Sequence, residues 1–112
     1  MKNIILLSIC LGMQSCGKVE LMPSTSHEIM ATVKELKGEK AVLINVWALW
    51  CAPCVEEFPM IVDLGEEHHD LEVIFISADF DDQIGDVRAF LDQNGVHSIS
   101  YIKDEKDESF IL

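Results

Sequence analysis

The chain has 112 residues, which allows one small domain, and 49% of them are hydrophobic, which is enough for a core and disfavours disorder of the whole chain. Its 20 acidic residues outnumber the 8 basic ones and give a formal charge of −12. This balance argues against nucleic acid and anionic lipid as electrostatic partners, because both are bound through clustered lysine and arginine, and it predicts a solvated acidic surface.

Residues 1–16 have the pattern of an export signal. Lys2 precedes an apolar run over residues 4–13, and a polar segment with small residues follows the run. This order is typical of secretory signals. A run of about ten residues is roughly half the length that a membrane-spanning helix needs. We therefore expect a leader over residues 1–16 and a domain over residues 17–112 that lies outside the cytoplasm, in the bacterial cell envelope.

Cys16 is the candidate lipidation site. It follows Ser15 directly after the apolar run and precedes Gly17, which resembles a bacterial lipoprotein signal, where this cysteine becomes the lipidated first residue. Met13 and Gln14 depart from the commonest pattern, which has leucine and a small residue at those positions. Three outcomes therefore stay open: a lipoprotein held to the membrane by its N-terminal lipid, a soluble secreted protein, and an uncleaved anchor.

The sequence after the leader alternates between strand and helix patterns. Thr25 and Glu28 have the spacing of a capping box at the start of the first helix. In chain order we expect an edge strand at Val19–Met22 before Pro23, a helix from Thr25 to Gly38, a strand at Ala41–Trp47, a helix from Cys51 to His68, a strand at Leu71–Ser77, an acidic loop at Asp79–Asp82, a helix from Ile84 to Gly95, and a short strand at Ser98–Ile102. The two middle strands are nearly continuous apolar sequence, which is typical of strands buried on both faces. The alternation predicts an α/β fold with a parallel sheet and crossover helices on its faces.

Cys51 and Cys54 form a C-x-x-C pair at the expected start of a helix. Two intervening residues at a helix start let the two sulfur atoms approach to bonding distance. The first cysteine faces unpaired N–H groups and the positive end of the helix dipole, which lowers the pKa of such thiols to roughly 3.5–7.5. We therefore expect Cys51 to be the nucleophile and Cys54 the resolving thiol. Pro53 fixes the backbone of the first turn, and Trp50 offers exchange partners an apolar platform.

A C-x-x-C pair is a modest signal by itself. It also supplies half of a zinc site, but no second C-x-x-C or H-x-x-H follows, and His68 and His69 are adjacent at a helix end. A purely structural disulfide is the other alternative. The order of buried strand, Trp-Cys-Ala-Pro-Cys and helix in an exported chain favours redox chemistry with no metal and no other cofactor.

Residues 45–54, Asn-Val-Trp-Ala-Leu-Trp-Cys-Ala-Pro-Cys, resemble the strand and active-site signature of the thioredoxin superfamily. The Glu-Phe-Pro segment at residues 57–59 is typical of its TlpA/ResA-like branch of membrane-tethered thiol–disulfide oxidoreductases. The clear match runs over about residues 41–95. The resemblance implies a three-layer α/β/α thioredoxin-like fold, a Cys51–Cys54 dithiol that acts as a reductant, protein disulfides as substrates, and a membrane-bound electron-donor protein as a partner.

The resemblance also bears on two polar residues. Many thioredoxins have a buried acid on the strand before the motif, and this acid passes a proton to the second cysteine. Asn45 occupies that position here and cannot titrate. Glu57 matches the acid of the Glu-Phe-Pro segment and is a candidate for part of that role, with an exposed or structurally paired carboxylate as the alternative.

The chain departs from the family pattern after the third predicted helix. Family members have a cis-proline loop, an antiparallel hairpin and a last helix there, but the only prolines of this chain are Pro23, Pro53 and Pro59. We therefore expect a thioredoxin-like domain that is incomplete at its C-terminus, with the Ala41–Trp47 strand as an exposed apolar edge. The alternative function is accordingly a non-catalytic thioredoxin-fold binding lipoprotein or an inactive fragment.

Overall fold

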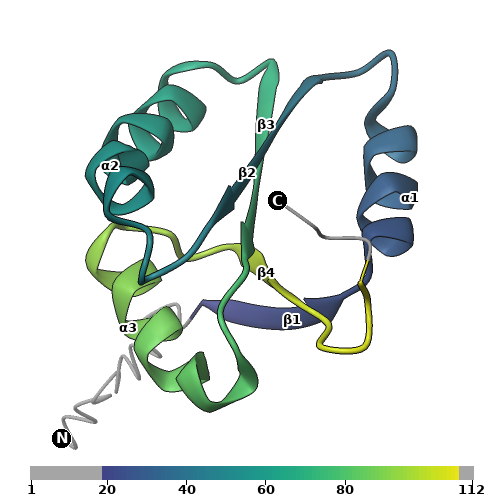
Figure 1. Ribbon diagram of the computed structural model, residues 1–112. Helices are drawn as coiled ribbons and strands as arrows, with labels where there is room; N and C mark the ends of the chain where they lie inside the picture. The colour runs from purple at the N-terminus through teal and green to yellow at the C-terminus, as the bar shows by residue number, and fades with distance from the viewer. Residues whose placement is uncertain (1–18, 109–112) are drawn as a thin grey trace, which may run out of the picture.

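The computed structural model describes residues 19–108, which form a four-stranded sheet with helices on both of its faces (Figure 1). In chain order the elements are β1 (Glu20–Ser24), α1 (Ser26–Leu36), β2 (Ala41–Trp47), α2 (Ala52–Glu67), β3 (Leu71–Ser77), the 3-10 helix η1 (Asp81–Gln83), α3 (Ile84–Gln93) and β4 (Ile99–Lys103). Within this part of the chain, no helix has the length and hydrophobicity needed to cross a membrane. The expected leader, with Cys16, lies outside the described residues.

All strand pairs of the sheet are parallel, and the strands lie in the order β1-β4-β3-β2. β2 pairs with β3 along its whole length, from the Ala41–Leu71 pair to the Trp47–Ser77 pair. β3 and β4 pair at two positions near their C-terminal ends. Because the strands are parallel, their C-terminal ends meet at one edge of the sheet, and the loops that follow β2 and β3 are neighbours there.

Helices cover both faces of the sheet, with α2 and α3 on one face and α1 on the other (Figure 1). Under α1, Ile29 packs with Ile74 and Ile76. Under α2 and α3, four aromatic rings contact one another: Trp47, Phe58, Phe75 and Phe90. These layers confirm the predicted three-layer α/β/α thioredoxin-like fold.

The first helix begins with the predicted capping box. The Thr25 hydroxyl accepts the Glu28 N–H at 3.2 Å, and the Glu28 carboxylate accepts the Thr25 N–H at 2.8 Å. The helix ends at Leu36, and Gly38 follows it with a φ of 87°, a backbone conformation that glycine adopts without strain. The local signals at both ends of α1 therefore correspond to the observed ends.

The prediction that the Ala41–Trp47 strand is buried on both faces was right about packing and wrong about full burial: Val42 and Val46 pack on the α1 side and Trp47 on the other side, but Ala41 and Ile44 are exposed. β2 is the last strand of the sheet, and no strand lies on its other side within residues 19–108. Ile44 in the middle of β2 is 38% exposed, whereas Trp47 at its end is buried. An apolar run reports how hydrophobic a strand is but not how many neighbours it has, so the sequence pattern alone placed this strand too deep. The exposed apolar edge inferred from the family resemblance is what the described residues show.

Candidate redox-active site

The site begins where β2 ends and α2 starts. Trp47 is the last residue of β2, and the chain then turns over Ala48–Cys51, with the Cys51 N–H donating to the Ala48 carbonyl at 3.1 Å. Cys51 is the N-cap of α2. Pro53 lies in the first turn of that helix, where a backbone N–H has no intrahelical acceptor, so proline loses no hydrogen bond there.

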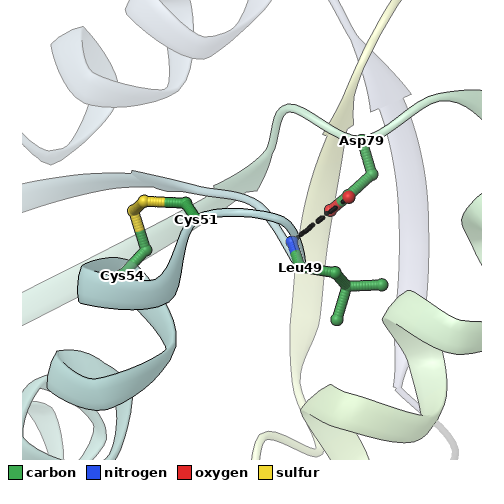
Figure 2. The surroundings of a disulfide bond; sticks show 4 residues. All are labelled: Leu49, Cys51, Cys54 and Asp79. Carbon is green, nitrogen blue, oxygen red and sulfur yellow. Dashed lines mark hydrogen bonds between the residues drawn. A yellow bond between two sulfur atoms is a disulfide. The ribbon is translucent and has the colours of Figure 1, made fainter.

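A disulfide joins Cys51 to Cys54 across the first turn of α2 (Figure 2). The two Cα atoms are 5.3 Å apart, within the range that disulfides commonly span. Both cysteines are half-buried, so neither residue is enclosed in the core. The predicted pair is therefore close enough to cycle between a dithiol and a disulfide without unwinding the helix.

The surroundings of Cys51 favour a thiolate once the disulfide is reduced. The N-terminus of α2 carries the unpaired N–H groups and the positive end of the helix dipole. The first turn of α2 contains no acidic residue to oppose a negative charge on the sulfur. Glu56 and Glu57 come one turn later and are exposed.

The two tryptophans near the pair differ in burial. Trp47 is 1% exposed and belongs to the aromatic core, whereas Trp50, directly before Cys51, is 67% exposed. A large apolar side chain with that exposure beside a reactive sulfur provides contact area for an incoming protein.

The two polar residues suggested by the resemblance occupy different surroundings. Asn45 is half-buried on β2, and its side-chain oxygen is buried without a hydrogen-bond partner in the part of the chain that the structure describes. Glu57 is on the exposed surface of α2, with no ion pair among residues 19–108. A role for either residue in proton transfer stays a prediction.

Sequence reasoning missed Asp79, which it placed in an acidic loop at Asp79–Asp82. Asp79 follows β3 and is 2% exposed, whereas Asp81 and Asp82 are exposed in η1. Its carboxylate accepts the N–H of Leu49, two residues before Cys51, at 3.2 Å (Figure 2). The three aspartates of this loop look alike in the sequence, and only the pairing of β2 with β3 places one of them against the active-site turn.

No group of three or more histidine, cysteine, aspartate or glutamate side chains in residues 19–108 is arranged to hold a metal ion. His68 is the C-cap of α2, and His69 follows it in a turn.

Comparison with known families gives the identity of the fold. A model of the AhpC/TSA family matches residues 19–110, which is most of the chain. The chain belongs to the AhpC/TSA family. This family is thioredoxin-like, in agreement with the signature at residues 45–54 and with the three-layer fold described above.

Individual relatives of this AhpC/TSA family chain carry thioredoxin-like names. The thioredoxin-like protein YneN of Bacillus subtilis is 39% identical over 66 residues, which cover 55% of this chain and 37% of YneN. The thiol-disulfide oxidoreductase ResA of Oceanobacillus iheyensis is 39% identical over 49 residues, which cover 42% of this chain and 25% of ResA. The matched region is thus well under half the length of either curated relative.

A solved structure also resembles the chain. It is a solution structure from Bacteroides vulgatus, provisionally assigned as a thiol-disulfide oxidoreductase. It aligns with a TM-score of 0.48 and 26% identity, over 62% of this chain and 45% of that one.

Proposed function

We propose that this protein is an extracytoplasmic thiol–disulfide oxidoreductase that reduces disulfides in other proteins through Cys51 and Cys54. One observation carries the proposal: the two cysteines form a disulfide at the N-terminus of α2, with Cys51 in the N-cap position. The family membership and the names of YneN and ResA support it.

The reaction transfers two electrons from the reduced pair to the substrate. The Cys51 thiolate attacks one sulfur of the substrate disulfide, forms a mixed disulfide with it and releases the other substrate sulfur as a thiolate, which takes up a proton. Cys54 then loses its proton and attacks the Cys51 sulfur, which releases the second substrate thiol and leaves the Cys51–Cys54 disulfide. An electron-donor protein, which we propose is membrane-bound, reduces that disulfide again.

The location outside the cytoplasm rests on the leader at residues 1–16, and Cys16 is the proposed point of lipid attachment. A Cys16→Ser variant is expected to stay unprocessed and to lose its lipid. Normal cleavage together with unchanged membrane retention would contradict the lipid anchor without affecting the proposed chemistry.

The proposed chemistry is tested on the purified full chain by reduction of insulin with dithiothreitol as the electron source. We expect turnover by the native chain, none by Cys51→Ser, and a trapped mixed disulfide with the substrate in Cys54→Ser, because the resolving thiol is then absent. Met60→Ala is the control, since it changes an exposed residue of the same helix outside the pair. If reduction adds no hydrogen to the Cys51–Cys54 peptide by mass spectrometry and no variant differs from the native chain, a non-catalytic binding role replaces this proposal.

A further inference from the structure

We propose that Asp79 is a positioning residue that holds the Ala48–Cys51 turn against β3 and so keeps Cys51 at the N-terminus of α2. The consequence for exchange rates rests on the proposed function. The consequence for the Cys51 sulfur itself does not, because the reactivity of a thiol can be measured without any protein substrate.

Asp79 is a buried carboxylate that is hydrogen-bonded to two residues, Ser77 and Leu49. It is 2% exposed, and Ser77 beside it is fully buried. The Ser77 hydroxyl donates to the Asp79 carboxylate at 2.7 Å and accepts the Asp79 backbone N–H at 3.1 Å. Burying a carboxylate costs free energy unless hydrogen bonds replace those lost to water, so the partners of Asp79 decide whether it can stay buried.

The Leu49 N–H is a hydrogen-bond partner of this carboxylate from a distant part of the chain. Both carboxylate oxygens lie 3.2 Å from the Leu49 nitrogen, which is 30 residues away in sequence and two residues before Cys51 (Figure 2). Ser77 and Asp79 alone would make a local cap at the end of β3. The bond to Leu49 instead joins the loop after β3 to the turn that carries the reactive cysteine.

Among the hydrogen bonds at this turn and at the end of β2, the one from the Leu49 N–H depends on a side chain. The Ala78 N–H donates to the Trp47 carbonyl at 2.8 Å, and the Cys51 N–H donates to the Ala48 carbonyl at 3.1 Å. Both of these use backbone atoms and survive most substitutions. The bond from the Leu49 N–H to the Asp79 carboxylate, in contrast, can be removed by a mutation.

Loss of this bond loosens the turn directly before the N-cap. The thiolate of Cys51 is stabilised only while the sulfur faces the first N–H groups of α2, since the effect of the helix dipole falls off within one turn. A looser turn therefore lowers the thiolate fraction at neutral pH, and with it the rate of attack on any electrophile.

The test compares Asp79→Ala with Asp79→Asn in the full chain. Both variants lack the negative charge, so the difference between them reports the loss of the side chain's hydrogen bonds to Leu49 and Ser77 and not the loss of charge. The asparagine oxygen still accepts the Leu49 N–H, whereas alanine cannot. Asp82→Ala, which removes an exposed carboxylate of η1, is the control for charge at the surface. The readout is the alkylation of reduced Cys51 by iodoacetamide as a function of pH, followed by peptide mass spectrometry.

We expect the midpoint of Cys51 alkylation in Asp79→Ala to lie at higher pH than in Asp79→Asn, and alkylation at pH 7 to be about tenfold slower. Asp82→Ala should match the native chain. Equal midpoints and rates in Asp79→Ala and Asp79→Asn would overturn the inference, whatever the insulin assay shows. If circular dichroism shows that Asp79→Ala is unfolded, Ser77→Ala replaces it. The carboxylate then keeps its contact with Leu49 but loses the hydroxyl that orients it, and we expect a smaller shift in the same direction, whereas no shift would overturn the inference.

The insulin assay separates this inference from the proposed function. A native chain that alkylates at low pH but leaves insulin disulfides intact contradicts the function and leaves the role of Asp79 standing. A native chain that reduces insulin, together with indistinguishable Asp79 variants, contradicts the role of Asp79 alone.

Discussion

At the scale of single residues, Trp47 and Trp50 differ in role, because one is buried in the core and the other is exposed. Trp47 stacks on Phe90, with ring centroids 4.8 Å apart, and its indole N–H is buried without a partner within residues 19–108. Trp50 makes little contact with the fold and is mostly exposed. Burial of the first stabilises the domain, and exposure of the second leaves apolar surface free beside Cys51.

Trp50→Ala is therefore expected to affect exchange more than folding. The free energy of unfolding should change by less than about 0.5 kcal/mol, because an exposed side chain loses few contacts. The rate of insulin reduction should fall severalfold, while the rate with oxidised glutathione, which reaches the sulfur without needing a large platform, should stay near the native value. Met60→Ala, which removes an equally exposed side chain of α2, is the matched control. Equal losses on both substrates would show that Trp50 acts on the cysteines and not as a contact surface.

Asn45 shows what a residue pattern can and cannot predict. The resemblance identified it as the residue at the position of the family's buried acid, and an amide cannot release a proton at physiological pH. That its oxygen lacks a partner within residues 19–108 depends on which side chains surround it, and no spacing in the sequence encodes those neighbours.

At the scale of elements, helix α1 depends on its N-terminal cap. Thr25 and Glu28 satisfy each other's backbone N–H groups, and the Asp107 carboxylate accepts the Ser26 N–H at 2.6 Å from the far end of the described chain. The first two partners are local and predictable from a four-residue pattern. The third partner, Asp107, is 81 residues away in sequence, and the pairing of β1 with β4 brings it to the start of α1.

Thr25→Ala should lower the free energy of unfolding by about 1 kcal/mol, because it removes the acceptor for the Glu28 N–H. Thr25→Ser keeps that acceptor and is expected to differ little from the native chain. Urea unfolding followed by circular dichroism measures both. A loss of the same size in the serine variant would mean that the threonine methyl group, and not the cap, stabilises the helix.

Most element bounds followed from local signals. The strands at Ala41–Trp47 and Leu71–Ser77 were predicted at their observed bounds, since apolar runs that are short, rich in β-branched residues and bounded by turn signals favour strands. The last strand was predicted one residue early, at Ser98–Ile102 in place of Ile99–Lys103. Its ends are set by pairing with β1 and β3, which no local pattern reports.

At the scale of the whole molecule, one aromatic cluster joins the active-site edge to the core. Phe58 of α2 is fully buried, and its ring centroid lies 4.6 Å from that of Phe75 in β3 and 4.9 Å from that of Trp47 in β2. The helix that presents both cysteines is thereby fastened to the two strands beneath it.

Phe58→Ala should lower the free energy of unfolding by about 3–5 kcal/mol, because it removes a buried ring and leaves a cavity that the neighbouring rings cannot fill. Met60→Ala, two residues further along α2 and 64% exposed, is the control and should cost little. Urea unfolding monitored by tryptophan fluorescence reports the loss, since Trp47 contacts the mutated site. A loss of unfolding free energy below about 1 kcal/mol in Phe58→Ala would contradict the conclusion that this aromatic cluster stabilises the domain.

The sequence by itself determined the alternation of strands and helices, the cap of α1 and the Cys51–Cys54 pair at a helix start, because each depends on residues within one turn or one strand of each other. The apolar pattern of β2 did not report its place at the edge of the sheet, which only the family resemblance indicated, and the tertiary structure alone decided that Asp79, unlike Asp81 and Asp82, is buried against the active-site turn. Both facts depend on which strands become neighbours. Strand order arises from packing between segments far apart in the chain, and the composition of one segment does not specify its neighbours.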